Sequence, residues 1–407
     1  MHKDQRMLQA EAQPRAATWW LVFGLALGPA VSNGLGRFAY GLILPAMGED
    51  LAWSYAQAGW MNTANALGYA LGAGLAFYLI RRWSPARLFT LGMLLTTASL
   101  TASGLTGDFL LLSLLRALAG IGGAPVFIAG GVMASGLFGV DRGRSTLATT
   151  LYFGGASAGI LLSALSIPWI IGLFGTAAWP ATWLALGGFS ALCCIPALGA
   201  ARCARFTRPR QAVLAPVLSL GQLLRLAPLL VGYFCFAVGY IVYFTFIVAL
   251  MEETGASTAT VAGIWSVLGL AGLAAPFVWR PVLNHSLGGG ALALSSLATA
   301  LGTLLPLLLA GAWGLFVSAA LFGVSYMSSA GAMTSFCRKN LDPHQVGSAV
   351  SLFTVLFAIG QIIGPVAAGR LADATSSLAV GFLAAGVILA LGGGISLLQG
   401  RLADNDE

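Results

Sequence analysis

Residues 19–45 read WWLVFGLALGPAVSNGLGRFAYGLILP, an apolar run long enough to cross a lipid bilayer as one helix. A single permanently ionised side chain, Arg37, interrupts this run. A guanidinium at membrane depth costs several kcal/mol, and chains keep such groups where they face water or a partner. The stretch therefore predicts a membrane-spanning helix with a functional cation, and a cation there indicates an anionic ligand.

The rest of the chain continues this apolar character. Of its 407 residues, 58% are hydrophobic and 8% are charged, and the mean hydropathy is +0.87, values outside the range of soluble domains. Apolar stretches of ~20 residues recur from end to end, and a backbone in lipid satisfies its hydrogen bonds as a helix. We predict an all-α polytopic membrane protein with twelve transmembrane helices, at residues 18–46, 57–80, 87–106, 109–138, 145–172, 179–200, 222–251, 258–279, 289–310, 312–336, 346–370 and 377–398.

Basic side chains lie almost entirely on one side of the predicted spans. Seventeen of the twenty Lys and Arg residues fall in the head, the tail and alternate loops, Arg370 falls on the opposite side, and Arg37 and Arg116 lie within spans. This bias predicts that both termini are cytoplasmic, in a protein of the cytoplasmic (inner) membrane. The net charge of +7 follows the same pattern, so it indicates contact with the lipid bilayer and not with nucleic acid.

The chain divides near residues 201–221, where the apolar pattern stops and arginines and prolines accumulate. We predict an N-terminal six-helix bundle with a cytoplasmic head (1–200), a basic cytoplasmic linker (201–221) and a C-terminal six-helix bundle with a short cytoplasmic tail (222–407). The loops before the fifth and eleventh spans echo each other, and both lead into Gly-rich helices. Two halves of the same orientation predict a parallel repeat with a binding site between them.

These features resemble the major facilitator superfamily of secondary transporters over nearly the whole chain. Residues 34–47 (GLGRFAYGLILPAM), 57–60 (QAGW) and 65–69 (NALGY) are similar to the YbfB/YjiJ-like branch. Residues 116–122 (RALAGIG) match the superfamily's fourth-helix Arg-Gly pattern, which the family links to proton or substrate handling. The resemblance implies a monomeric transporter that works by rocker-switch alternating access, and not an enzyme.

Two motifs of that superfamily are altered here. The loop between the second and third spans keeps its basic residues, but residues 68–87 contain no Asp, so the acid of the superfamily's usual charge latch at the inner gate is missing. The fifth span has the glycines of the antiporter signature without its proline. The resemblance, with a Gly-Pro pair that can bend the eleventh span, assigns gating or conformational roles to Arg81, Arg82, Asp141, Arg142, Arg144, Gly364 and Pro365.

Two arginines are expected at one depth of the central cavity. Arg37 lies eight residues before Pro45 and Arg116 eight residues after Asp108, which places both roughly 12 Å below the outer surface. Their charges repel each other unless an anion joins them, and guanidinium groups suit carboxylate, phosphate or sulfonate. Two alternatives stay open: Arg37 pins the first span by bonding helix carbonyls, or Arg116 plays a structural role.

Further polar and aromatic residues are predicted to line the same cavity. Asn33, Arg37 and Tyr40 share one helical face, and the second span repeats this pattern with two Asn and a Tyr. Amides that bond neighbouring helices and aromatic stripes that only pack are the alternatives. Cations in one half and neutral groups in the other suit an amphipathic organic anion, and we expect a carboxylate. The predicted substrate-binding set is Arg37, Arg116, Asn33, Tyr40, Asn65, Tyr69, Tyr152, Tyr240, Trp265, Tyr326 and Gln361.

No Asp, Glu or His lies in the middle of any predicted span, and the five cysteines show no metal-ligand spacing. We therefore expect no metal, no cofactor and no catalytic group. A proton relay normally needs a buried acid or His, so a uniporter, an anion exchanger and a symporter whose substrate carries the proton stay open. The competing function is an exporter of hydrophobic drug-like or neutral compounds, which explains the aromatic residues but leaves Arg37 without a role.

Overall fold

Helices account for the regular structure of this chain. The computed structural model describes residues 15–80, 82–139, 141–204 and 218–402, and within these ranges there is no strand. The N-terminal half contains α2 (Arg15–Pro29), η1 (Ala30–Phe38), α3 (Tyr40–Asp50), α4 (Tyr55–Leu79), α5 (Pro85–Ser103), α6 (Phe109–Gly136), α7 (Arg142–Phe174), η2 (Thr176–Ala178) and α8 (Trp179–Cys203). The C-terminal half contains α9 (Leu220–Glu253), α10 (Thr258–His285), α11 (Gly290–Leu308), α12 (Ala312–Tyr326), α13 (Ser328–Asn340), α14 (Pro343–Thr375) and α15 (Leu378–Leu397).

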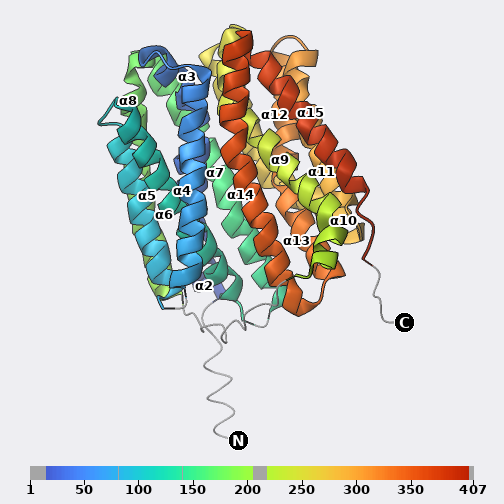
Figure 1. The fold of residues 1–407 in the computed structure, drawn as a ribbon. Coiled ribbons are helices and arrows are strands. Elements are labelled where there is room, and N and C mark those ends of the chain that lie inside the picture. The colour runs from blue at the N-terminus through green and yellow to red at the C-terminus, as the bar shows by residue number, and fades with distance from the viewer. Residues whose placement is uncertain (1–14, 81, 140, 205–217, 403–407) are drawn as a thin grey trace, which may run out of the picture.

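The helices pack side by side, and Figure 1 shows that the long helices run between the same two ends of the molecule. Nine helical stretches in the described ranges are long and apolar enough to cross a membrane. The other three spans are α4, α5 and the interrupted first span, in which polar side chains or a change of helix type replace a continuous apolar run. Twelve spans in two bundles confirm the predicted fold class. Most of the predicted linker lies outside the described residues.

Helix starts follow local sequence signals. The side chain of Ser54 accepts a hydrogen bond from the backbone N–H of Gln57, and the Gln57 side chain bonds back to the backbone of Ser54. This capping box satisfies two of the N–H groups that a helix leaves free at its start. An equivalent box begins α9, at Ser219 and Gln222. Side-chain caps of the same kind begin α5, α6, α7 and α10, at Ser84, Asp108, Asp141 and Ser257.

The first span is not the continuous α-helix predicted over residues 18–46. A π-helical segment, Ala30–Phe38, separates α2 from α3, and the backbone N–H of Ala39 reaches Gly34 five residues back at 2.9 Å. Gly34 lies so close to α7 that an added Cβ would be 2.5 Å from the Cα of Gly159. Such π segments are rare and occur frequently at functional sites. The tenth span, predicted over 312–336, is likewise divided at Met327 into α12 and α13.

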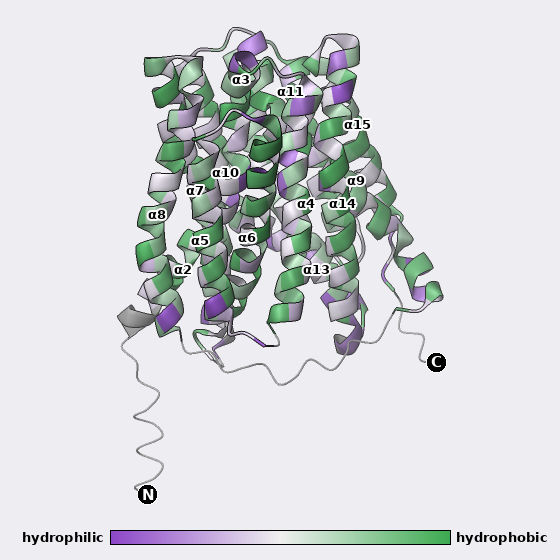
Figure 2. Cartoon of the chain, turned by 60° about the vertical axis from the view of Figure 1, so that its left-hand side comes forward, coloured by the Kyte–Doolittle hydropathy of each residue, from purple (hydrophilic) through white to green (hydrophobic). Residues whose placement is uncertain are grey.

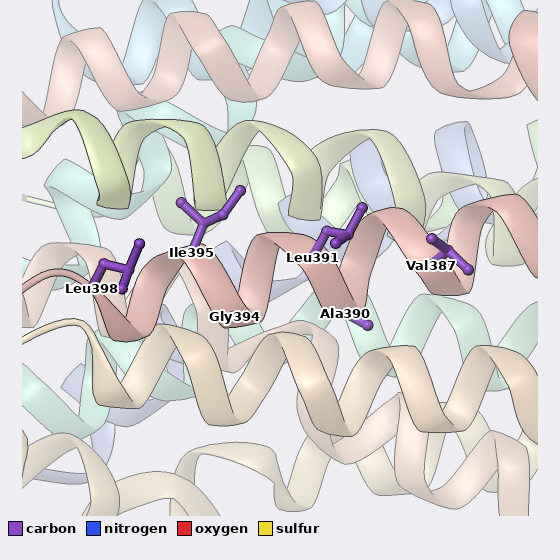
Figure 3. Close-up of a pocket in the computed structure, with 6 residues that line it drawn as sticks. All are labelled: Val387, Ala390, Leu391, Gly394, Ile395 and Leu398. Carbon is purple, nitrogen blue, oxygen red and sulfur yellow. The ribbon is translucent and has the colours of Figure 1, made fainter.

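Both α2 and the end of α15 lie at the same end of the bundle, which we call the terminal end; the opposite end is the distal end (Figure 1). Figure 2 shows apolar residues along the outer faces of the helices and polar residues gathered mainly towards the two ends. On α15, Val387, Leu391 and Leu398 border a shallow hollow of about 430 Å³ in which Gly394 leaves room (Figure 3). This apolar surface fits lipid tails and confirms a multi-pass membrane protein.

Candidate functional site

The π-helical segment places Arg37 inside the protein. Its side chain is 6% exposed, and its Nε and Nη2 atoms are buried with no hydrogen-bond partner. The guanidinium lies over the ring of Tyr69 in α4, 5.3 Å from the ring centroid. No acidic side chain among the described residues forms a salt bridge with Arg37. A buried cation in this position has unused donors that an anion would satisfy.

Residues of the C-terminal half face Arg37 across the interface. Its charge acts on the phenol groups of Tyr69 and of Tyr240 in α9. The Nε2 atom of Gln361 in α14 donates a hydrogen bond to the Tyr240 hydroxyl. Asn33, one turn before Arg37, lies beside Tyr69, and its Oδ1 atom has no hydrogen-bond partner. The structure therefore brings these predicted site residues together from both halves.

Arg116 in α6 holds the backbone next to Arg37. Its Nη1 atom donates a 2.7 Å hydrogen bond to the carbonyl oxygen of Gly36. Its guanidinium also lies over two rings, 4.9 Å from the centroid of Tyr40 and 5.3 Å from that of Trp183. The Nδ2 atom of Asn65 in turn donates to the carbonyl oxygen of Arg116 at 3.1 Å. These contacts favour the alternative in which Arg116 positions the first span.

Two of the predicted lining tyrosines use their hydroxyl groups on backbone carbonyls. Tyr40 donates to the carbonyl oxygen of Ala58, and Tyr152 donates to that of Val126, both at 2.7 Å. Both side chains are fully buried. They therefore join helices of the N-terminal half to each other, which favours a structural role for both over the predicted lining role.

Aromatic rings from both halves fill the space beside Arg37. Phe38 stacks on Phe244 with ring centroids 4.3 Å apart, and Phe244 meets the edge of Trp265 at 6.1 Å. Tyr240 and Tyr326 lie parallel at 6.4 Å. We call these five residues the ring cluster. Phe38 and Phe244 were missed from the sequence, although the position of Phe38 beside Arg37 was a signal that could have found it.

Polar atoms within and beside the ring cluster are also without partners among the described residues. The Nε1 atom of Trp265 is buried and makes no hydrogen bond to any described residue. The hydroxyl group of Tyr326 lies beside that of Ser157 in α7, and neither completes a hydrogen bond. Ser157 was not among the predicted site residues. Buried polar atoms without described partners thus occur on the Arg37 cation and on neutral groups in and beside the ring cluster.

The two halves touch at the distal end through polar contacts that all involve the first turns of α4. Asp373, which follows α14's apolar stretch, accepts hydrogen bonds from the backbone N–H groups of Tyr55 and Ala56 at 2.8 and 2.9 Å. The Tyr55 hydroxyl donates to Glu253 of α9. A carboxylate at a helix start is stabilised by free N–H groups and by the helix dipole. We call these interactions the distal latch.

Deeper in the same seam, the halves interact through side chains of α4. Asn62 donates to the Thr245 hydroxyl at 2.6 Å, and Thr63 donates to the carbonyl oxygen of Ile362 at 2.8 Å. Gly59 lies against the backbone of Pro365, where an added Cβ would be 2.4 Å from the carbonyl oxygen. Figure 1 shows α4 and α14 closest near the distal end and diverging towards the terminal end.

The predicted gating residues fall at both ends. Pro365 belongs to the distal seam, and the absence of a side chain at Gly364 lets α14 approach the carbonyl oxygen of Val238 in α9. At the terminal end, Arg144 forms an exposed 3.3 Å salt bridge with Asp141 of its own half, and the Arg82 guanidinium lies over the ring of Tyr78. Arg81 and the side chain of Arg142 lie outside the described residues.

Two six-span halves around a polar centre, with broken helices beside it, are typical of membrane transporters. The protein belongs to the family described as "Uncharacterised MFS-type transporter YbfB", whose model matches residues 29–397. This confirms membership of the major facilitator superfamily and a secondary transporter with a small-molecule substrate. No curated protein sequence matches the chain.

Solved structures of transporters share this fold. The inward-facing, occupied form of a bacterial homologue of the human lysosomal transporter Spinster superposes with a TM-score of 0.73 at 16% identity, and covers 95% of this chain and 97% of its own. The unoccupied form gives 0.70 with the same identity and coverage. A mutant of the nucleoside transporter NupG gives 0.69 at 13% identity, with 93% and 97% covered. These likenesses concern the fold.

Proposed function

We propose that the protein carries a small organic anion, a carboxylate, across the cytoplasmic membrane. One observation carries this proposal: the Arg37 guanidinium is buried, and among the described residues its Nε and Nη2 atoms have no hydrogen-bond partner and no acidic side chain forms a salt bridge with it. A carboxylate offers two acceptor oxygens with the spacing of the guanidinium fork. A neutral hydrophobic substrate would leave the donors unsatisfied at a cost of about 1–3 kcal/mol each, which disfavours an exporter of drug-like or neutral compounds.

The proposed cycle is a rocker-switch around this site. The distal latch holds the halves together at one end, so substrate enters from the terminal end, which the charge bias assigns to the cytoplasm. An anion bound to Arg37 of the N-terminal half would also face Tyr240 and Gln361 of the C-terminal half. Contacts with both halves would draw the two halves together. Closure at the terminal end and release of the latch would then open the site to the outside.

We propose that coupling uses no buried carboxylate of the protein. The cations near the centre are Arg37 and Arg116, and the acids of the latch lie at the distal end. The coupling species is then a proton carried on the substrate or an exchanged anion, moved by a single chain acting as a monomer. In proteoliposomes under a pH gradient, proton flux that persists without any substrate would contradict this assignment.

The function is tested by the thermal stability of the purified protein in detergent. A ligand that binds the folded state raises its apparent stability by mass action. We expect small carboxylates to raise the melting temperature and amines or neutral compounds of equal size to leave it unchanged. Stabilisation by neutral hydrophobic compounds, with none by carboxylates, would favour the exporter instead.

Replacement of Arg116 by leucine should weaken anion binding although Arg37 is intact. The substitution removes the donor to the Gly36 carbonyl, which immediately precedes Arg37, and so frees the π-helical segment. We expect affinity to fall about tenfold, as for one lost charged hydrogen bond. Arg116→Lys, which keeps a donor near Gly36, should recover part of it. Binding titrations on both variants separate this positioning role from unfolding, because partial recovery of affinity in Arg116→Lys would show that the lost donor, and not a lost fold, weakens binding.

Loss of the Asp373 carboxylate should open the distal end. Asp373→Ala removes the acceptor for two N–H groups of α4, worth about 0.5–2 kcal/mol, or roughly a 2- to 30-fold shift between conformations. Spin labels at Leu105 and Trp313, exposed distal residues of opposite halves, would then move apart in a background without native cysteines. Asp342→Ala is the matched control, because Asp342 makes no capping hydrogen bond. An unchanged distance would remove Asp373 from the latch.

A further inference from the structure

The enclosed site offers free charge for a single anionic group. Arg37 makes no hydrogen bond to the described part of the protein, whereas Arg116 already donates to the Gly36 carbonyl and stacks on Tyr40 and Trp183. The Arg116 guanidinium is therefore committed to the backbone of the first span. A ligand that enters the site meets one available guanidinium fork.

The other unpartnered polar groups, in and beside the ring cluster, are neutral. Trp265 Nε1 is a buried donor without a partner, and the unpartnered hydroxyl groups of Tyr326 and Ser157 lie beside each other. A second carboxylate placed among these groups would be a buried charge without a counter-charge, which is strongly unfavourable. A hydroxyl or carbonyl group of a ligand, in contrast, would satisfy these donors and acceptors.

Flat aromatic faces accompany both the cation and the neutral groups. Phe38 follows Arg37 in the chain, so the ring cluster begins at the cation, and Phe38 also meets the edge of Tyr326 at 6.3 Å. Tyr326 lies parallel to Tyr240 and carries one of the neutral hydroxyl groups. Planar aromatic ligands gain stacking or edge contacts with such rings that a saturated ring of the same size does not.

We propose that the transported anion is an aromatic monocarboxylate with a hydroxyl or carbonyl group on the ring opposite the carboxylate. The carboxylate binds Arg37, the ring lies against the ring cluster, and the distal ring substituent bonds to Trp265 and the Tyr326–Ser157 pair. This inference rests on the proposed transport of organic anions and narrows it to one substrate class.

Four probes of matched size test the inference in binding titrations with the purified full-length protein: 4-hydroxybenzoate, benzoate, cyclohexanecarboxylate and terephthalate. We expect 4-hydroxybenzoate to bind most tightly. Cyclohexanecarboxylate should bind about tenfold more weakly than benzoate, because two aromatic contacts of ordinary strength are lost. Terephthalate, with its second charge, should also bind at least about tenfold more weakly than 4-hydroxybenzoate.

Trp265→Phe tests the neutral groups, because it keeps an aromatic ring while it removes the Nε1 donor together with part of the indole volume. The variant should lose the preference for 4-hydroxybenzoate over benzoate, whereas Trp313→Phe, at an exposed distal position, should keep it. Equal binding of benzoate and cyclohexanecarboxylate, or binding of none of the four probes while other organic anions bind, would overturn this inference and leave the proposed function intact. Binding of no organic anion at all would overturn both.

Discussion

Replacing Arg37 by glutamine abolishes anion uptake in proteoliposomes, while the protein still inserts and keeps its fold. Glutamine is long enough to fill most of the space but carries no charge and only two N–H donors. Two charge-assisted hydrogen bonds of about 1.5–3 kcal/mol each disappear, so uptake at limiting substrate should fall about 100-fold or more. The thermal shift produced by the bound carboxylate should disappear in parallel, because the same bonds hold the ligand in the ground state.

Two further variants make this result specific. Arg37→Lys should also transport poorly, since an ammonium is a point charge and does not reproduce the planar fork. Arg87→Gln is the matched control: it makes the same chemical change at a guanidinium that stacks on Trp83 near the terminal end, away from the site. It should transport at the parent rate. Parent-level uptake by Arg37→Gln would remove the main support for an anionic substrate.

The sequence predicted the twelve spans because their signals are local. The capping box at Ser54 and the turn residues between spans are set by neighbouring residues, and helix limits such as 109–136 follow the apolar pattern closely. The π-helical segment was not predictable in the same way. Within it, Gly34 contacts α7 and the Gly36 carbonyl accepts from Arg116, and both partners belong to distant parts of the chain.

The same distinction separates the predictable and unpredictable parts of the site. The enclosure of Arg37 follows from the cost of a charge in lipid, which the sequence alone conveys. Which polar groups face a ligand depends on tertiary partners: Tyr40 bonds a carbonyl 18 residues away, whereas the equally buried Trp265 has no partner for its Nε1 atom. The distal latch joins residues 318 positions apart, and no local pattern indicates it.

Gly59→Ala should arrest transport by preventing closure of the distal end. The added Cβ would lie 2.4 Å from the carbonyl oxygen and 2.8 Å from the carbonyl carbon of Pro365, backbone atoms that belong to the other half. Overpacking of this kind costs about 1–3 kcal/mol, and separating the halves relieves it without disturbing either bundle. The distal-closed state should therefore lose population roughly 5- to 150-fold, with the Leu105–Trp313 label distance increased and uptake reduced to a similar extent.

Two neighbouring glycines of α4 separate this conformational effect from a folding effect. An added Cβ at Gly68 would lie 2.0 Å from the carbonyl oxygen of Ala117, within the same half, so Gly68→Ala should lower the melting temperature. Gly74→Ala meets nothing within 4 Å and should be neutral in every assay. Gly59→Ala should keep a parent-like melting temperature and lose uptake, because the clash is removed by a motion that the transport cycle already contains. If the distal end of Gly59→Ala still closes and uptake is normal, the clash with Pro365 does not limit closure and this prediction is wrong.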